Sequence, residues 1–196
     1  MEKRELVYRE LLRGFLELGK AVFTQLELSG ALNISLSTVN NALLPLRNMG
    51  AVKVKRRSFD VVNAKKLLYY WASVRNIEKD IIYKTRVGFK GTVAEVEKAM
   101  PPGVVFAAYT AYKFRFNDAP ADYSEVYVYC ADSGLKEVIK RFPQRGNNPN
   151  LFVLSKDFDD TGMPIAHIFV DLWNLREWYA RDFVKAADGK IGGILA

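Results

Sequence analysis

The chain has 196 residues, 49% of them apolar and 13% aromatic, which suits a packed globular protein and argues against disorder. One cysteine and one histidine exclude a disulfide framework and any Cys/His zinc site within a single chain. The whole formal charge of +7 falls on residues 1–75, which hold thirteen Lys/Arg against six Asp/Glu, whereas residues 76–196 hold sixteen of each. This asymmetry predicts two domains, the first of them basic enough to attract a polyanion.

The first two predicted helices span residues 2–18 and 24–32. Residues 2–18 carry an apolar side chain at every third or fourth position, and these are predicted to share one buried face: Val7, Leu11, Phe15 and Leu18. The second helix opens with a T-x-x-E capping box, in which the side chains of Thr24 and Glu27 each bond the other's backbone amide. A short turn then leads to Ser35, which is predicted to cap a third helix.

The third helix, residues 36–49, is the candidate recognition helix. Four apolar residues share one face and are predicted to pack onto the first two helices: Leu36, Val39, Leu43 and Leu46. The opposite face and its flank are polar: Ser37, Thr38, Asn40, Asn41, Arg47 and Asn48. Such side chains suit a DNA major groove, because they bond phosphates and because an Asn can pair with an adenine edge. Pro45 removes a backbone hydrogen bond, which predicts a kink or a short final turn.

Residues 51–62 have the pattern of a basic β-hairpin, the wing of a winged helix-turn-helix. Residues 51–55 alternate small or apolar with basic side chains, residues 56–58 form the tip, and residues 59–62 return. The cations of this hairpin are placed to bind phosphates or to enter the minor groove: Lys53, Lys55, Arg56 and Arg57. The alternative is a solvated turn without a binding role.

A fourth helix is predicted from Asn63, its cap, to Arg75. Its apolar residues need a partner surface, which is either the second domain or the same helix of another copy in a homodimer: Leu67, Leu68, Trp71 and Val74. Residues 1–76 are therefore predicted to form a winged helix-turn-helix domain with double-stranded DNA as its partner.

Residues 77–196 are predicted to form a second domain, because strands and helices alternate there as in an α/β or α+β fold with a mixed sheet. The predicted strands are residues 81–86, 125–130, 151–155 and 166–170. The predicted helices are residues 92–99, with Thr92 as cap, 104–114, 134–142 and 175–187, before a glycine-rich tail.

The sequence gives little support to catalysis. Neither G-x-x-x-x-G-K-[S/T] nor G-x-G-x-x-G occurs, and no cofactor is expected. His167 lies in an apolar run and is predicted to be structural. Nucleotidyl transfer with two metal ions needs two carboxylates two positions apart on a strand, where this chain offers Glu125 followed by Tyr127. A second acidic cluster is predicted to be a solvated turn: Asp157, Asp159 and Asp160. We therefore expect no catalytic residue and no metal site.

Three segments, together with a winged helix placed before a sheet domain, resemble the AbiEi-type antitoxin family of bacterial and archaeal toxin–antitoxin systems. They are Ala107–Ala111, Val126–Tyr129 and Val170–Trp173, the last of which precedes a helix with Arg176 and Ala180. The resemblance implies a first domain that binds promoter DNA, a nucleotidyltransferase-like second domain that serves regulation, and a toxin protein as partner. It carries over no catalytic residues.

These features lead to the hypothesis of a cytoplasmic, sequence-specific DNA-binding transcriptional regulator, which the resemblance makes the antitoxin-type autorepressor of a toxin–antitoxin pair. One alternative is a nucleotidyltransferase-like, metal-dependent enzyme that uses residues 157–160. Another is a winged helix that binds protein, although the basic residues 53–57 favour DNA. No apolar run approaches the ~20 residues of a membrane span, so no membrane partner is expected.

Overall fold

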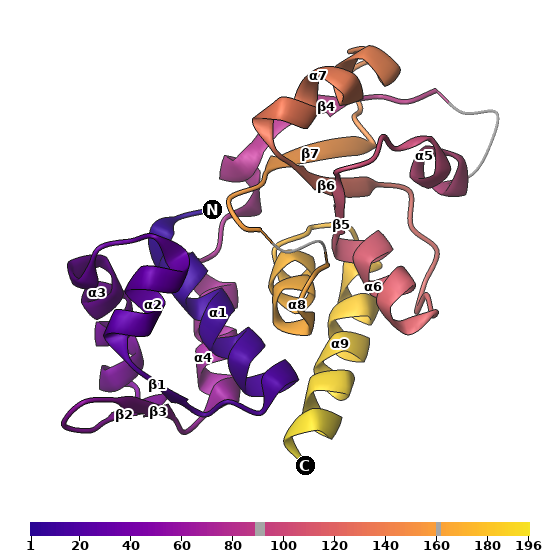
Figure 1. The fold of residues 1–196 in the computed structure, drawn as a ribbon. Helices are drawn as coiled ribbons and strands as arrows, with labels where there is room; N and C mark the ends of the chain where they lie inside the picture. Colours follow the sequence, from indigo (N-terminus) through magenta and orange to yellow (C-terminus); the bar gives the residue numbers. More distant parts are fainter. Residues whose placement is uncertain (89–92, 160–161) are drawn as a thin grey trace.

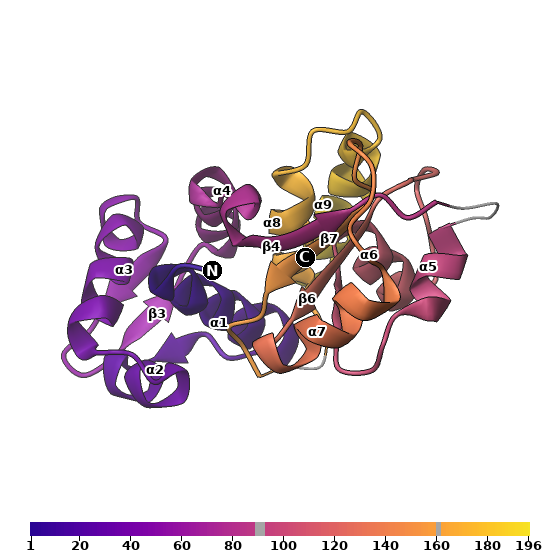
Figure 2. The ribbon, with the colours of Figure 1, turned by 90° about the horizontal axis from the view of Figure 1, so that it is seen from above.

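The computed structural model describes residues 1–88, 93–159 and 162–196, and it combines helices with two β-sheets (Figure 1). The mixed α and β content predicted from the sequence is confirmed. In Figure 2, residues 25–61 lie on one side of the molecule and residues 93–116 and 132–141 on the other, with the first helix and the helices of residues 64–74 and 165–173 between them. Within the described part of the chain, no helix is both long and apolar enough to cross a bilayer.

The first part of the chain combines three helices with a small antiparallel sheet. Its strands pair in the order β1-β3-β2, so β3 is central. Strand β1 was not predicted, because two residues are too short to display an alternating pattern. In chain order the elements are α1 (Lys3–Leu18), β1 (Val22–Phe23), α2 (Gln25–Leu32), α3 (Leu36–Asn48), β2 (Val52–Val54) and β3 (Phe59–Val61).

Helix α1 buries a face that differs in part from the predicted one. Val7 and Leu11 are fully buried and Phe15 is half-buried, but Leu18 is 61% exposed, so its predicted burial is wrong. With about 3.6 residues per turn, Leu18 falls at the edge of the buried face, in the last turn of the helix. The apolar residues that α1 does bury are Val7, Tyr8, Leu11, Leu12 and Leu16.

Helix α3 buries Val39, Leu43 and Leu46 as predicted, but Leu36 is 48% exposed. Leu36 is the first helical residue, and a helical side chain leans back over the preceding turn, so this one points past the core. The helix continues through Pro45 to Asn48, so the turn after the proline is still helical. The carbonyl that loses its partner to the proline ring belongs to Asn41, an exposed residue.

The second part of the chain is a four-stranded mixed sheet with helices on both faces. The strand order is β4-β7-β6-β5, and β6 and β7 are parallel whereas the other neighbours are antiparallel. One face packs against α5 and α7, and the other packs against α6, α8 and α9. The strands are β4 (Ile81–Thr85), β5 (Val105–Ala107), β6 (Val126–Cys130) and β7 (Leu151–Ser155); the helices are η1 (Ile77–Asp80), α5 (Val93–Ala99), α6 (Ala108–Phe116), α7 (Asp132–Arg141), α8 (Ile165–Trp173) and α9 (Ala180–Leu195).

Three predicted elements of this part are wrong. The predicted strand 166–170 is helix α8, whose residues 165–172 are all buried, His167 and Asp171 included, so no solvent-exposed face marks a helical period. The predicted helix 104–114 begins as strand β5, and the chain changes conformation at Ala108, whose φ of 47° ends the strand. The last helix starts at Ala180, and its glycines belong to the helix and not to a tail. The predicted cap Thr92 lies outside the described residues.

Helix α4 (Ala64–Val74) joins the two parts. It packs against α1 on one side and against α8 on the other, so its buried face is covered within the chain. Leu67, Leu68 and Trp71 are fully buried there, whereas Val74 is 38% exposed. Buried apolar side chains from both parts form one continuous cluster.

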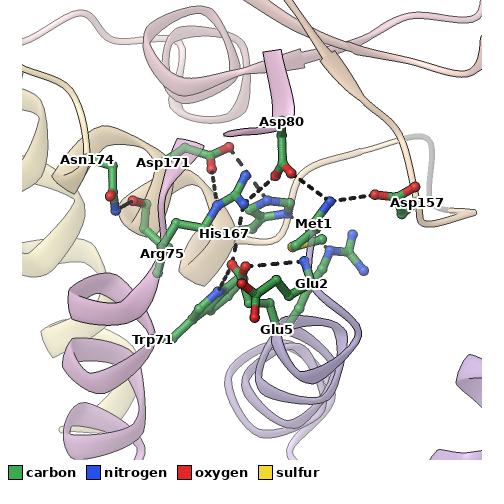
Figure 3. A network of polar contacts seen from close by, with 12 residues as sticks. Met1, Glu2, Glu5, Trp71, Arg75, Asp80, Asp157, His167, Asp171 and Asn174 are labelled. Carbon is green, nitrogen blue, oxygen red and sulfur yellow. Dashed lines mark hydrogen bonds and ion pairs between the residues drawn. The ribbon is translucent and has the colours of Figure 1, made fainter. Parts of the chain in front are cut away.

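A buried guanidinium lies at the centre of this junction (Figure 3). Arg75, which follows α4, has a side chain only 1% exposed, and it pairs with carboxylates of three other elements. Glu5 of α1 lies 3.4 Å away, Asp171 of α8 lies 3.5 Å away, and Asp80 of η1 accepts a hydrogen bond. Trp71 donates its indole N–H to Glu5 at 3.0 Å, which holds that carboxylate in place.

His167 extends the same network through α8. Its Nδ1 accepts from Arg9 Nε at 3.1 Å, and its Nε2 lies 3.0 Å from the hydroxyl of Tyr129, which also contacts Asp171 at 2.9 Å. Burial lowers the pKa of His167 well below 6.5, and the guanidinium groups of Arg9 and Arg75 lower it further. Burial raises the pKa of Asp171 to about 6, although pairing with Arg75 acts in the opposite direction.

Loss of the Arg75 side chain should destabilise the fold strongly. Arg75→Ala leaves Glu5 and Asp171 buried without their cation, and we expect the free energy of unfolding to fall by about 3–5 kcal/mol in urea titrations. The matched control is Arg176→Ala, which removes an ion pair with Glu78 from a side chain that is 85% exposed, and it should cost less than about 1 kcal/mol. Equal losses for the two variants would contradict a central role for Arg75.

His167 should make stability depend on pH. Its pKa is lower in the folded than in the unfolded state, so its contribution is complete above about pH 6.5 and is lost as the pH falls further. We expect the free energy of unfolding to fall between about pH 7 and about pH 5, and to fall further in the unchanged protein than in the His167→Gln variant. The difference between the two proteins should grow by at most about 1.4 kcal/mol for each pH unit below about 6.5. Asp171 has a raised pKa in the folded state, so its contribution to stability increases as the pH falls, in the unchanged protein and in the His167→Gln variant alike. Parallel stability profiles would refute the prediction.

Candidate nucleic-acid interface

Two helix caps fix where α2 and α3 begin. The predicted capping box is confirmed: Glu27 N donates to Thr24 Oγ1 and Thr24 N donates to Glu27 Oε1, each at 3.1 Å. Ser35 caps α3 by accepting from the backbone N–H of Thr38 at 3.1 Å. Both helices therefore begin at defined residues, and their first turns lie at the edge of one surface hollow.

The predicted hairpin is confirmed, with β2 and β3 as its strands. Lys55 N donates to Ser58 O at 2.8 Å, which closes a turn with Arg56 and Arg57 as its two central residues. Both arginines are exposed, and neither has a hydrogen bond or an ion pair with another described residue. Lys55 pairs with Asp60 Oδ2 at 2.6 Å, which draws its ammonium group back along the hairpin.

The polar face of α3 divides into residues engaged within the protein and residues open to solvent. Asn40 accepts from Arg47 Nη2 at 3.1 Å, so its carbonyl oxygen is occupied. The hydroxyl of Thr38 lies 2.9 Å from that of Ser35, within the helix cap. Asn41 is exposed, and its side chain has no partner among the described residues; the other exposed polar residues of this face are Ser37 and Asn48.

The start of α2, the start of α3 and the hairpin converge on a hollow of about 370 Å³. Four of the predicted DNA-binding residues line it: Arg47, Lys55, Arg56 and Arg57. The Nε of Arg47 is buried and has no hydrogen-bond partner among the described residues, so this guanidinium retains a donor. The hollow thus gathers cations from α3 and from the hairpin, although Ser37, Thr38, Asn40, Asn41, Asn48 and Lys53 do not line it.

Three exposed apolar residues of the hollow are absent from the predicted site: Leu26, Leu36 and Val54. Leu36 is predicted to belong to the core because its helical period matches Val39 and Leu43. Leu26 and Val54 carry no sequence signal beyond their side-chain type. Only the folded arrangement brings these three side chains to the same place.

The acidic residues of the alternative enzyme hypothesis have other contacts. Asp157 forms an ion pair with the Met1 amino group at 2.5 Å, and Glu125 accepts a hydrogen bond from the Tyr179 hydroxyl. Tyr127, the residue two positions after Glu125, donates to Glu177. Asp160 lies outside the described residues. Within residues 1–88, 93–159 and 162–196, no three His, Cys, Asp or Glu side chains form a group that could hold a metal ion.

The chain matches no protein-family model, no curated protein and no solved structure.

Proposed function

We propose that residues 1–76 form a winged helix-turn-helix that binds duplex DNA, and that the protein is a sequence-specific transcriptional regulator. The observation that carries the proposal is the position of Arg56 and Arg57, exposed at the hairpin tip and lining the same hollow as the first residue of α3. The element order α1-β1-α2-α3-β2-β3, with its three-stranded antiparallel sheet, supports the winged-helix assignment.

In this proposal α3 enters the major groove and the β2–β3 hairpin lies along the adjacent backbone. The hairpin arginines bind phosphates, which supplies affinity without sequence preference. Asn41 supplies base recognition, because an amide can bond the N6 and N7 atoms of adenine at the same time. Asn40 is less suited to this role, since its oxygen already accepts from Arg47.

We assign residues 77–196 a regulatory role, as a nucleotidyltransferase-like domain that binds a toxin partner in a toxin–antitoxin pair. The resemblance of Val126–Tyr129 and Val170–Trp173 to the antitoxin family supports this assignment. The mixed sheet with helices on both faces is compatible with it. The direct test is co-purification of the full chain with the product of a neighbouring toxin gene, followed by measurement of promoter DNA binding with and without that product.

The hairpin arginines should contribute two phosphate contacts. Changing both Arg56 and Arg57 to Ala should weaken binding to any duplex and reduce the slope of log affinity against log salt by about 1.8. The measurement is fluorescence anisotropy over a range of salt concentrations. The matched control changes Arg176 and Lys185 to Ala, because it removes the same charge from exposed positions of the second part and should leave the slope unchanged. An unchanged slope in the hairpin variant would remove the hairpin from the interface.

Asn41 should determine part of the sequence preference. Asn41→Ala should cost about 1–3 kcal/mol on the preferred duplex and little on random duplex DNA, because a lost base contact matters only at the correct sequence. Asn40→Ala is the matched comparison on the same helix and should cost less. Equal losses of Asn41→Ala on both duplexes would mean that Asn41 contacts only the backbone.

A further inference from the structure

The hollow between α2, α3 and the hairpin contains an exposed apolar surface that phosphate binding leaves without a role. Leu26 is 72% exposed, Leu36 is 48% exposed and Val54 is 53% exposed. The three side chains come from three different elements and line one concave site. Isolated surface aliphatics are ordinary, but a concave cluster of them is a feature of binding sites.

The same hollow is strongly cationic. Arg47, Lys55, Arg56 and Arg57 line it together with the aliphatic residues, and only Lys55 has an ion pair, with Asp60, among the described residues. A fitting ligand is therefore anionic where it meets the guanidinium groups and apolar where it meets the leucines. This combination argues against a ligand that is only a polar anion and against a ligand that is only apolar.

We propose that this hollow receives the C5-methyl groups of thymine in duplex DNA, with Leu26, Leu36 and Val54 as the contacting side chains. The inference rests on the proposed DNA-binding function. Thymine offers the major groove its only methyl group, a few ångströms from the phosphates that the arginines would bind. Leu36 is suitably placed, because the N-terminal residues of a recognition helix are those that contact base edges.

The methyl contact would complement the amide contact of Asn41. An adenine presents a donor and an acceptor to Asn41, and the thymine paired with it presents a methyl group and an acceptor. Asn41 lies outside the hollow and five residues after Leu36, about 140° further round the helix, so the two side chains would recognise A·T pairs at different positions of the site. The preferred duplex should contain thymines at contacted positions.

The test uses the full-length chain and the duplex that it selects from a random pool. A second duplex replaces thymine by deoxyuridine, which keeps the base pairing and removes only the methyl group. We expect the second duplex to bind about fourfold more weakly for each contacted methyl group, from the usual free energy of burying one methylene. Leu36→Ala should bind the thymine duplex more weakly and should distinguish less between the two duplexes, as a double-mutant cycle measures.

The matched control is Ile194→Ala, because Ile194 is also 48% exposed but belongs to α9, and it should leave the thymine preference intact. Equal affinity of the unchanged protein for the two duplexes would overturn the inference while the proposed DNA binding stands. So would a selected duplex without thymine, or a Leu36→Ala variant with an undiminished thymine preference. Absence of any duplex binding would overturn the proposed function and this inference together.

Discussion

One buried guanidinium, that of Arg75, determines how the two parts of the chain are held together. Water no longer solvates this charge, so it must be compensated by carboxylates at a few ångströms, and Glu5 and Asp171 lie at 3.4 and 3.5 Å. Because these acids belong to α1 and α8, the arrangement is satisfied only when both helices flank the end of α4. Trp71, fully buried and bonded to Glu5, belongs to the apolar surroundings that exclude water and strengthen the pairing.

This centre also connects the second part of the chain to the proposed recognition helix. Helix α1 packs against α3 on one side and against α8 on the other, and it carries Glu5 and Arg9 into the polar network. A partner or ligand that displaced α8 would disturb His167 and Asp171 and thereby act on α1. The proposed regulatory role of residues 77–196 thus has a contiguous set of contacts through which it would operate.

The proposed DNA-binding surface is assembled differently, from exposed side chains on capped helices and a tight turn. Such a surface contributes little to stability, so its composition is free to serve a ligand. Within the described part of the isolated chain, two guanidinium groups have no anionic partner, those of Arg56 and Arg57. The side chain of Leu36 is likewise not covered by other apolar groups, since it is 48% exposed. The proposed DNA ligand would offer phosphates to the guanidinium groups of this site and methyl groups to its exposed aliphatic residues.

The sequence by itself determined the features that neighbouring residues control: the capping box at Thr24, the turn at Arg56 and the strands of residues 126–130 and 151–155. Tertiary structure decided the rest. An entirely buried run such as α8 has no solvent-exposed face, so its helical period is not apparent until the surrounding helices are known. Leu36 fits the apolar period of α3 yet lies outside the core, because burial depends on what packs over a position. The ion pairs of Arg75 join residues that are far apart in the sequence, so no local sequence pattern predicts them.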